Sequence, residues 1–204
     1  MEKREYVAGS IYVMDERTNA HSAIATNLLG LLHGQLRGHR CRPLNSDMKL
    51  RIRLADQTRF YYPDAQVVCR PNPPGDHFQD EPVIVFEVVS ESTRRIDEQE
   101  KRAAYLSIPT LNAYVLIKQD HPAATVWRRT EHGFVREDYA GADAVVPFDD
   151  IGVRLSLGDL REGLAQTVAL AHRASACEYF PYPHEAPRHS PPPRRSRRCR
   201  RSPS

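Results

Sequence analysis

Hydrophobic and polar positions follow two periodicities along the chain, one typical of strands and one typical of helices. Strand-like runs alternate apolar with polar residues or form short β-branched blocks, at residues 4–14, 48–54, 59–68, 84–90, 111–117, 123–129 and 133–138. Within the first run, Ala8-Gly9 is a turn signal and predicts a hairpin. The strand at residues 84–90, IVFEVVS, is apolar on both faces except for Glu87, which indicates a buried strand carrying one charge.

Helical spacing occurs in two places. Residues 20–38 carry apolar side chains at three- and four-residue steps, and Gly38 is a suitable stop. The apolar positions of this helix are Ile24, Leu28, Leu31, Leu32 and Leu36. Residues 97–108 form the second predicted helix, with Asp97 as its N-cap and Pro109 directly after its end.

The order of these elements predicts the fold class and the domains. Strands and helices are interspersed, which indicates a mixed α/β (α+β) domain with a central sheet flanked by helices. Residues 70–82 are rich in Pro, Gly and Asp and predict a loop between two strands. We expect one folded domain over residues 1–175, ending in a helix-like segment at residues 157–176, and a disordered Pro/Arg/Ser-rich tail over residues 176–204.

The charge of the chain is unevenly distributed. The whole chain has a formal net charge of +3, but residues 186–204 contain seven arginines and no acidic residue. The remaining residues, 1–185, carry 22 basic and 26 acidic side chains, a net charge of −4. The body is therefore mildly acidic, and the basic tail is the segment expected to attract nucleic-acid phosphates without sequence preference.

Composition excludes several classes of protein. No apolar run approaches the roughly 18 residues of a membrane-spanning helix, and the N-terminus lacks the apolar centre of a secretory signal. The four cysteines, Cys41, Cys69, Cys177 and Cys199, are widely spaced without a C-x-x-C pair. This spacing predicts reduced thiols in a cytoplasmic protein rather than a zinc site or a disulfide framework.

Two acidic residues in apolar strands are the candidates for a functional site. A buried carboxylate such as Glu87 costs several kcal/mol unless a cation, a metal or hydrogen-bond donors accompany it. Asp64, after Pro63 in the strand-like run 59–68, is the second such acid. If the two strands are neighbours, the carboxylates converge, and a divalent cation between them offsets their repulsion. Each acid also has a structural alternative to metal binding. Asp64 could be a turn or bulge residue. Glu87 could form an ion pair with Arg51, Arg94 or Lys101.

A basic residue completes this group. Lys101, near the start of the helix after Glu87, can point back at the sheet and orient a water or a phosphate. Mg²⁺ suits such a site, because it binds one or two carboxylates together with waters and a substrate phosphate. A solvated helix position is the alternative for Lys101.

The residues around both acids resemble a known family. EYVAGSIYVM, AHSAIATNLLGLL, SDMKLRI, YYPDAQVV and VIVFEVVSESTRRIDEQEKRAAYLSIPTLNAYVLI resemble the Uma family of restriction-endonuclease-like proteins, in order and with matching spacing. The resemblance covers residues 4–165 and implies the PD-(D/E)xK nuclease fold. It further implies a Mg²⁺-dependent endonuclease (Mn²⁺ is the other candidate ion) that hydrolyses phosphodiester bonds in DNA.

The resemblance assigns roles to individual residues. Asp64 and Glu87 take the places of the motif acids and would bind the metal, with the Val88 carbonyl as a third ligand. The third motif position, two residues after the Glu, is Val89 here, so the motif lysine is absent from its strand. Lys101 occupies the place in the next helix to which this lysine is thought to have moved in the family.

Other matches leave alternatives open. His21 matches a family His and is expected either to contact a phosphate or metal-bound water or to make a structural contact. Ser90 and Ser92 also match and are expected to cap the helix start, with a hydrogen bond near the site as the alternative; Asp97 matches as a cap. Ser10 stands where the family commonly has an acid. This departure, the acidic body and the missing strand lysine favour a second hypothesis, an inactive nuclease fold that serves as a binding or assembly module. Cleavage of both strands would favour a homodimer.

Overall fold

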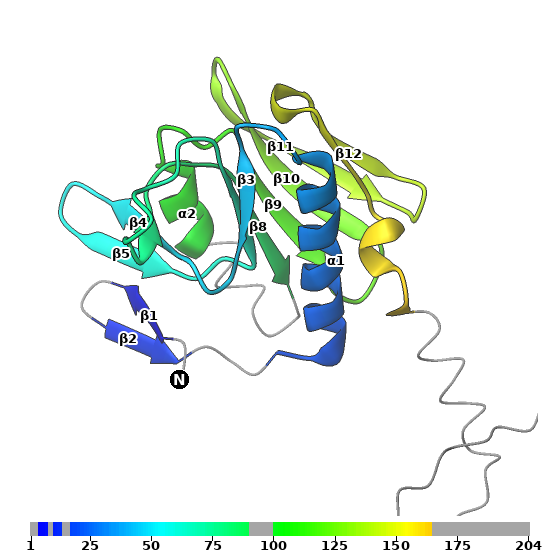
Figure 1. Cartoon of the computed structure of the whole chain (residues 1–204), viewed down its shortest axis with the longest axis horizontal. Helices are drawn as coiled ribbons and strands as arrows, with labels where there is room; N and C mark the ends of the chain where they lie inside the picture. Colours follow the sequence, from blue (N-terminus) through cyan, green and yellow to red (C-terminus); the bar gives the residue numbers. More distant parts are fainter. Residues whose placement is uncertain (1–3, 8–9, 14–16, 90–99, 165–204) are drawn as a thin grey trace, which may run out of the picture.

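A six-stranded mixed sheet forms the centre of the protein (Figure 1). The structure, a computed structural model, describes residues 4–7, 10–13, 17–89 and 100–164. The strand order is β11-β10-β9-β8-β6-β3, in which only the β8–β9 pair is parallel. The strands are β3 (Arg42–Asn45), β6 (Ala65–Val68), β8 (Pro82–Val89), β9 (Ala113–Lys118), β10 (Ala123–Thr130) and β11 (Gly133–Ala140).

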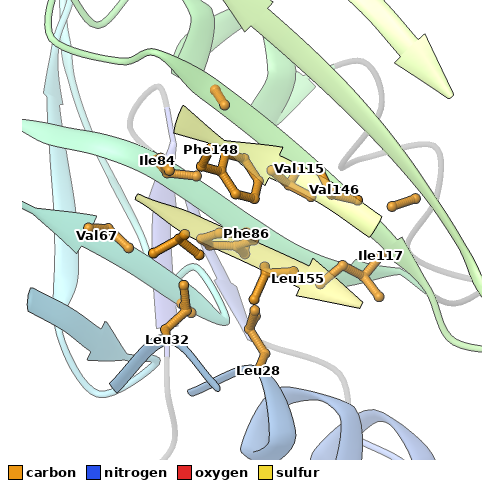
Figure 2. Close-up of a cluster of buried hydrophobic side chains, with 14 of the residues drawn as sticks. Leu28, Leu32, Val67, Ile84, Phe86, Val115, Ile117, Val146, Phe148 and Leu155 are labelled. Atoms are coloured by element: carbon orange, nitrogen blue, oxygen red, sulfur yellow. The ribbon is translucent and has the colours of Figure 1, made fainter. Parts of the chain in front are cut away.

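One face of this sheet is covered by α1 (Asn19–Gln35) and a hairpin of β12 (Val145–Phe148) and β13 (Val153–Ser156). Leu28 and Leu32 of α1 point at Val67 and Phe86 of the sheet, with β13 packed beside them (Figure 2). The helix-period pattern therefore buries the expected stripe, and Gly38, at φ +78°, lies in the turn after the helix. Between β12 and β13 lies the 3-10 turn η2 (Asp149–Ile151).

The opposite face is covered by a short helix, α2 (Arg102–Leu106), and by a second sheet. This five-stranded sheet has the order β2-β1-β5-β4-β7. Its strands are β1 (Arg4–Val7), β2 (Ser10–Val13), β4 (Lys49–Arg53), β5 (Thr58–Tyr61) and β7 (Phe78–Gln79). Leu50 and Ile52 of β4 share one buried apolar cluster with Tyr105 of α2 and Val85 of β8. The central sheet is therefore enclosed on both faces, as its apolar strand β8 predicts.

Several sequence predictions need correction. The run at residues 59–68 is not one strand but two, β5 and β6, which belong to different sheets and separate at Pro63 and Asp64. The helix predicted over residues 97–108 is described only from residue 100, with α2 ending at Leu106. Strands β3 and β12 escape the pattern because each contains a proline, Pro43 or Pro147, which sequence rules treat as a strand breaker.

The C-terminal prediction is tested only at its beginning. Within the helix-like segment predicted at residues 157–176, the structure places the 3-10 turn η3 (Asp159–Arg161), and residues 165–204 lie outside the described part of the chain. The domain boundary at residue 175 and the disordered tail therefore stay predictions. Among the described residues, no helix is both long and apolar enough to cross a membrane.

The prediction of four reduced thiols is wrong for two of them. Cys41 and Cys69 form a disulfide. The β3–β6 register pairs Arg42 with Val68, so the residues one step further along, Cys41 and Cys69, face each other across the two strands. The two cysteines are 28 residues apart in the sequence, and only the pairing of β3 with β6 brings them together. The sequence alone therefore did not indicate the disulfide. The thiol argument for a cytoplasmic location is thereby lost.

Candidate active site

The two acids lie opposite each other at one end of the central sheet. Strands β6 and β8 are antiparallel neighbours, with Ala65 paired to Phe86. Continuing this register by one residue places Asp64 opposite Glu87. The start of α1 contributes His21, and the start of α2 contributes Lys101, at the same end. The structure therefore brings His21 to Asp64 and Lys101 to Glu87, as two pairs held from the two faces of the sheet.

Asp64 is 2% exposed and is held by three partners. Its Oδ2 accepts a hydrogen bond from the Val88 backbone N–H (2.7 Å) and lies 3.1 Å from His21 Nε2. Its Oδ1 forms an ion pair with the guanidinium of Arg17. Burial acts to raise the pKa of Asp64, but the hydrogen bond from His21, with the charges of His21 and Arg17 and the Val88 amide, holds it below its ordinary value. Asp64 is therefore a carboxylate kept charged.

Glu87 is 3% exposed and is held from the other face of the sheet. Its Oε1 accepts hydrogen bonds from the Tyr105 hydroxyl (2.9 Å) and from Lys101 Nζ (3.3 Å). Lys101 is 6% exposed, so the interpretation of a solvated helix position is wrong. Of the three cations considered for Glu87, Lys101 pairs with it, and the alternative of Arg94 stays untested. Arg51 instead makes two 2.7 Å hydrogen bonds to Asp80, and Arg94 lies outside the described residues.

The third motif position explains why the lysine must come from elsewhere. Val89 is 2% exposed and packs in the apolar cluster beneath α2, on the same face as Glu87. Lys101 reaches Glu87 from the helix side of that cluster. Helix α2 thus supplies the cation that strand β8 lacks, in agreement with the place expected for a lysine that has moved out of its strand.

Two residues of the site were missed by sequence reasoning. Tyr105 lies four residues after Lys101, so both point from one side of α2, and this helical spacing would have been a usable signal. The Tyr105 ring is held edge-to-face against Tyr61 (5.5 Å between centroids) and tilted against Tyr114 (5.0 Å). Arg17 precedes the N-cap of α1 and belongs to no periodic pattern, so no comparable signal in the sequence points to it.

His21 is both a structural and a candidate chemical residue. Its backbone N–H donates to the Thr18 side chain, which caps α1, and its Nε2 contacts Asp64. Its Nδ1 is buried and has no hydrogen-bond partner among the described residues. With Nε2 against Asp64, Nδ1 is left as a buried polar atom that could take part in one further hydrogen bond. The structural contact is therefore observed, and the chemical role stays a prediction.

The donor set suits a hard divalent cation. Asp64 and Glu87 supply carboxylate oxygens, and the Val88 carbonyl faces β6 as its N–H does, because both groups of a strand residue point to one side. Among the described residues, no three His, Cys, Asp or Glu side chains are grouped as a metal site. A site with two carboxylates and one carbonyl fits Mg²⁺, which keeps several waters, better than a metal held by side chains alone.

The remaining family positions are only partly visible. Ser10 begins β2, paired with Val7 of the hairpin, and its side chain lies outside the described part of the structure. Ser90, Ser92 and Asp97 lie outside the described residues altogether. Their predicted capping roles stay predictions.

A mixed sheet flanked by helices, with two buried acids at one end of the β6–β8 pair, is the arrangement of a restriction-endonuclease-like fold. The sequence matches the Uma2 family, described as "Putative restriction endonuclease", over residues 1–158, and the chain belongs to this family. Its fold is similar to the crystal structure of "a putative nuclease belonging to DUF820" from Anabaena variabilis ATCC 29413. That likeness has a TM-score of 0.62 and 20% identity, and covers 77% of this chain and 88% of the other. At this identity it supports the fold alone.

Two relatives come from Synechocystis sp. (strain ATCC 27184 / PCC 6803 / Kazusa). The "Uncharacterized protein slr1290" is 30% identical over 166 residues, which cover 80% of this chain and 86% of the relative. The "Uncharacterized protein sll1609" is 31% identical over 121 residues, 58% of this chain and 67% of the relative. Neither name assigns an activity.

Proposed function

We propose that the protein is a Mg²⁺-dependent endonuclease that hydrolyses phosphodiester bonds in DNA. The observation that carries the proposal is the pair of buried acids on neighbouring strands, Asp64 and Glu87, with a buried lysine against the second. A charged group is rarely buried without a partner or a task. Here three charged side chains are buried within one small region, each from a different element.

Each residue has a distinct task in this proposal. Asp64 and Glu87 would hold the metal, with the Val88 carbonyl as a third protein ligand, and Mn²⁺ is the alternative ion. Bound Mg²⁺ would activate a water and offset the charge that builds on the phosphate. Lys101 donates a hydrogen bond to the attacking water or to a phosphate oxygen, while Tyr105 keeps Glu87 in place. His21 accepts a hydrogen bond at Nδ1 from water in the site.

A nuclease assay tests the proposal. Supercoiled plasmid, linear duplex and single-stranded DNA are incubated with the full chain and Mg²⁺ or Mn²⁺, with EDTA as a blank. We expect metal-dependent cleavage that Asp64→Asn and Glu87→Gln abolish. Asp143→Asn, at an exposed acid of the same chain, is the matched control and should leave cleavage unchanged. Cleavage that survives in both site variants would contradict the assignment.

The second candidate is a nuclease fold without activity that serves as a binding or assembly module. The ion pairs of both acids favour it, because Arg17 and Lys101 already balance the two carboxylate charges without a metal. Absence of cleavage on every substrate, together with absence of metal binding, would favour this module over the endonuclease.

The basic tail is proposed as a contact to DNA that does not depend on sequence. Its seven arginines lie in residues 186–204, whereas residues 1–185 have a net charge of −4. Deleting residues 178–204 should leave the melting temperature unchanged and lower DNA affinity at low salt, measured by anisotropy of a labelled duplex. Unchanged affinity would remove the tail as a DNA contact. A homodimer is the state that two-strand cleavage would favour, and sedimentation equilibrium tests it.

A further inference from the structure

Arg17 is positioned differently from the other partners of Asp64. Its side chain is 28% exposed, whereas the carboxylate it pairs with is 2% exposed. The other two partners, Val88 and His21, occupy Oδ2 and belong to strand β8 and helix α1. Arg17 alone occupies Oδ1, and it lies before the cap of α1, outside any described helix or strand. Among the described residues, Arg17 is therefore the partly exposed partner of a buried oxygen that Val88 and His21 do not use.

A guanidinium and a metal ion cannot both bind Oδ1 closely, because two cations around one oxygen repel each other. The amide of Val88 and the ring of His21 are fixed by their elements and use the other oxygen, so they do not have to move. Arg17 is the partner on a long side chain that is partly in solvent. Metal binding at Asp64 thus requires Arg17 to find another partner.

We propose that Arg17 exchanges partners, pairing with Asp64 in the metal-free protein and binding a phosphate oxygen of the phosphodiester when Asp64 binds metal. This inference rests on the proposed function. A guanidinium displaced from Asp64 remains at the mouth of the site, where a phosphate would arrive, and its planar fork matches a phosphate group. Lys101 does not duplicate this role, because its side chain is 8% exposed and bound to Glu87 from the other helix.

The exchange has two consequences of opposite sign. Removing Arg17 removes a competitor for Oδ1, so metal affinity should increase. It also removes a phosphate contact, so DNA affinity at saturating metal should decrease. A counterion with no role in substrate binding gives the first effect without the second. The pair of measurements therefore separates a substrate-binding arginine from a structural one.

The experiment compares the full-length parent with Arg17→Gln, Arg17→Lys and Arg136→Gln. Arg136 is the matched control, since it is an exposed arginine on β11 that pairs with Asp138, and its loss removes the same charge. Mn²⁺ affinity is measured by calorimetry, and affinity for a labelled 20-base-pair duplex by anisotropy in Ca²⁺ at fixed salt. Arg17→Gln should bind Mn²⁺ about threefold more tightly and the duplex about tenfold more weakly. Arg17→Lys, which keeps the charge but not the fork, should lie between the parent and Arg17→Gln.

The other possible results distinguish failure of the phosphate role, of the partner exchange and of the proposed function. Tighter Mn²⁺ binding with duplex affinity equal to that of Arg136→Gln would overturn the phosphate role. Unchanged Mn²⁺ affinity in a parent that binds Mn²⁺ would overturn the exchange while leaving the proposed function intact. A parent that binds no Mn²⁺ would instead contradict the proposed function itself. If Arg17→Gln does not fold, Arg17→Lys decides, since it must still lose duplex affinity relative to the parent.

Discussion

The carboxylate of Asp64 accepts a hydrogen bond of 2.7 Å from the backbone N–H of Val88. Because Val88 directly follows Glu87 on β8, this single bond ties one motif acid to the strand that carries the other. A backbone donor cannot be removed by changing a side chain, and it has no rotamer freedom to lose. The spacing of the two acids therefore depends on the β6–β8 pairing rather than on the long side chains around them.

The first prediction concerns the stability of the site without metal. Glu87→Gln should lower the melting temperature in EDTA, because it weakens a buried ion pair, a change that costs about 3–5 kcal/mol when one partner is lost. Mg²⁺ or Mn²⁺ should raise the melting temperature of the parent but not of this variant. Glu137→Gln, which breaks a partly exposed pair with Arg128, is the control and should cost about 1 kcal/mol or less. A Glu87→Gln protein that melts above the parent would mean that repulsion between the acids dominates.

The second prediction isolates one hydroxyl. Tyr105→Phe removes the 2.9 Å hydrogen bond to Glu87 Oε1 while keeping the ring between Tyr61 and Tyr114. A hydrogen bond to a charged acceptor contributes roughly 1.5–3 kcal/mol. We expect a lower melting temperature and weaker Mn²⁺ binding, measured by scanning calorimetry and titration calorimetry. Tyr114→Phe should change stability without changing Mn²⁺ affinity, and equal effects on Mn²⁺ from both variants would reject a specific role for Tyr105.

The third prediction concerns pH and a site remote from the acids. Two hydrogen bonds from Arg51 hold the pKa of Asp80 below its ordinary value, despite the opposing effect of partial burial. Its stabilising contribution is therefore complete above the ordinary pKa of an aspartate, about 3.9, and is lost as pH falls through the lower pKa of the folded state. Melting curves from pH 6 to pH 2 should show that Asp80→Asn is less stable than the parent at pH 6 and equal to it at the acid end. Asp143→Asn should track the parent throughout.

The fourth prediction tests the disulfide between Cys41 and Cys69. Closing a segment with a sequence separation of 28 residues stabilises the fold by about 3–4 kcal/mol in the chain-entropy account. The double variant Cys41→Ser/Cys69→Ser should unfold at lower urea concentration than the parent, whereas Cys177→Ser/Cys199→Ser should not. Thiol titration in denaturant should find two fewer thiols before reduction than after it. Equal counts would show that the two cysteines remain reduced in solution.

The fifth prediction uses the only tryptophan. Trp127 is partly buried in the structure, with the Arg102 guanidinium 4.6 Å from the ring centroid. Quenching by neutral acrylamide should be weak in the parent and stronger in Arg102→Ala, which uncovers the ring. Arg136→Gln should leave quenching unchanged. A fluorescence response of the parent to added oligonucleotide would indicate base stacking on this residue instead.

Periodicity was sufficient for the elements that bury a whole face. Helix α1 and strands β4, β8, β9 and β10 were expected from their apolar spacing and were found with small shifts at the ends. The elements that failed are short or interrupted. Two of them contain Pro43 or Pro147, and β7 has only two residues, so local sequence carries almost no signal for them.

The residues of the candidate site likewise divide into those predicted from the sequence and those that were missed. Asp64 and Glu87 stood out because a charge inside an apolar run is costly wherever the run folds. Lys101 was predicted from its place after Glu87 and from the family resemblance, whereas Arg17 was not predicted, because it acquires its role only through tertiary contact. The disulfide between Cys41 and Cys69 was not predicted for the same reason. Pairings over long separations are set by strand register, which a single sequence does not reveal.

Because the lysine lies on helix α2 and not on strand β8, the proposed site of Glu87 and Lys101 forms only late in folding. A strand that carries both acid and lysine holds two members of the site as soon as it is synthesised. Here the acid strand ends in Val89, and Lys101 reaches Glu87 only after α2 has docked on the sheet. Arg17 and His21 likewise reach Asp64 only when the start of α1 is in place. In the proposed endonuclease, a nascent or partly unfolded chain would therefore carry the acids without their cations.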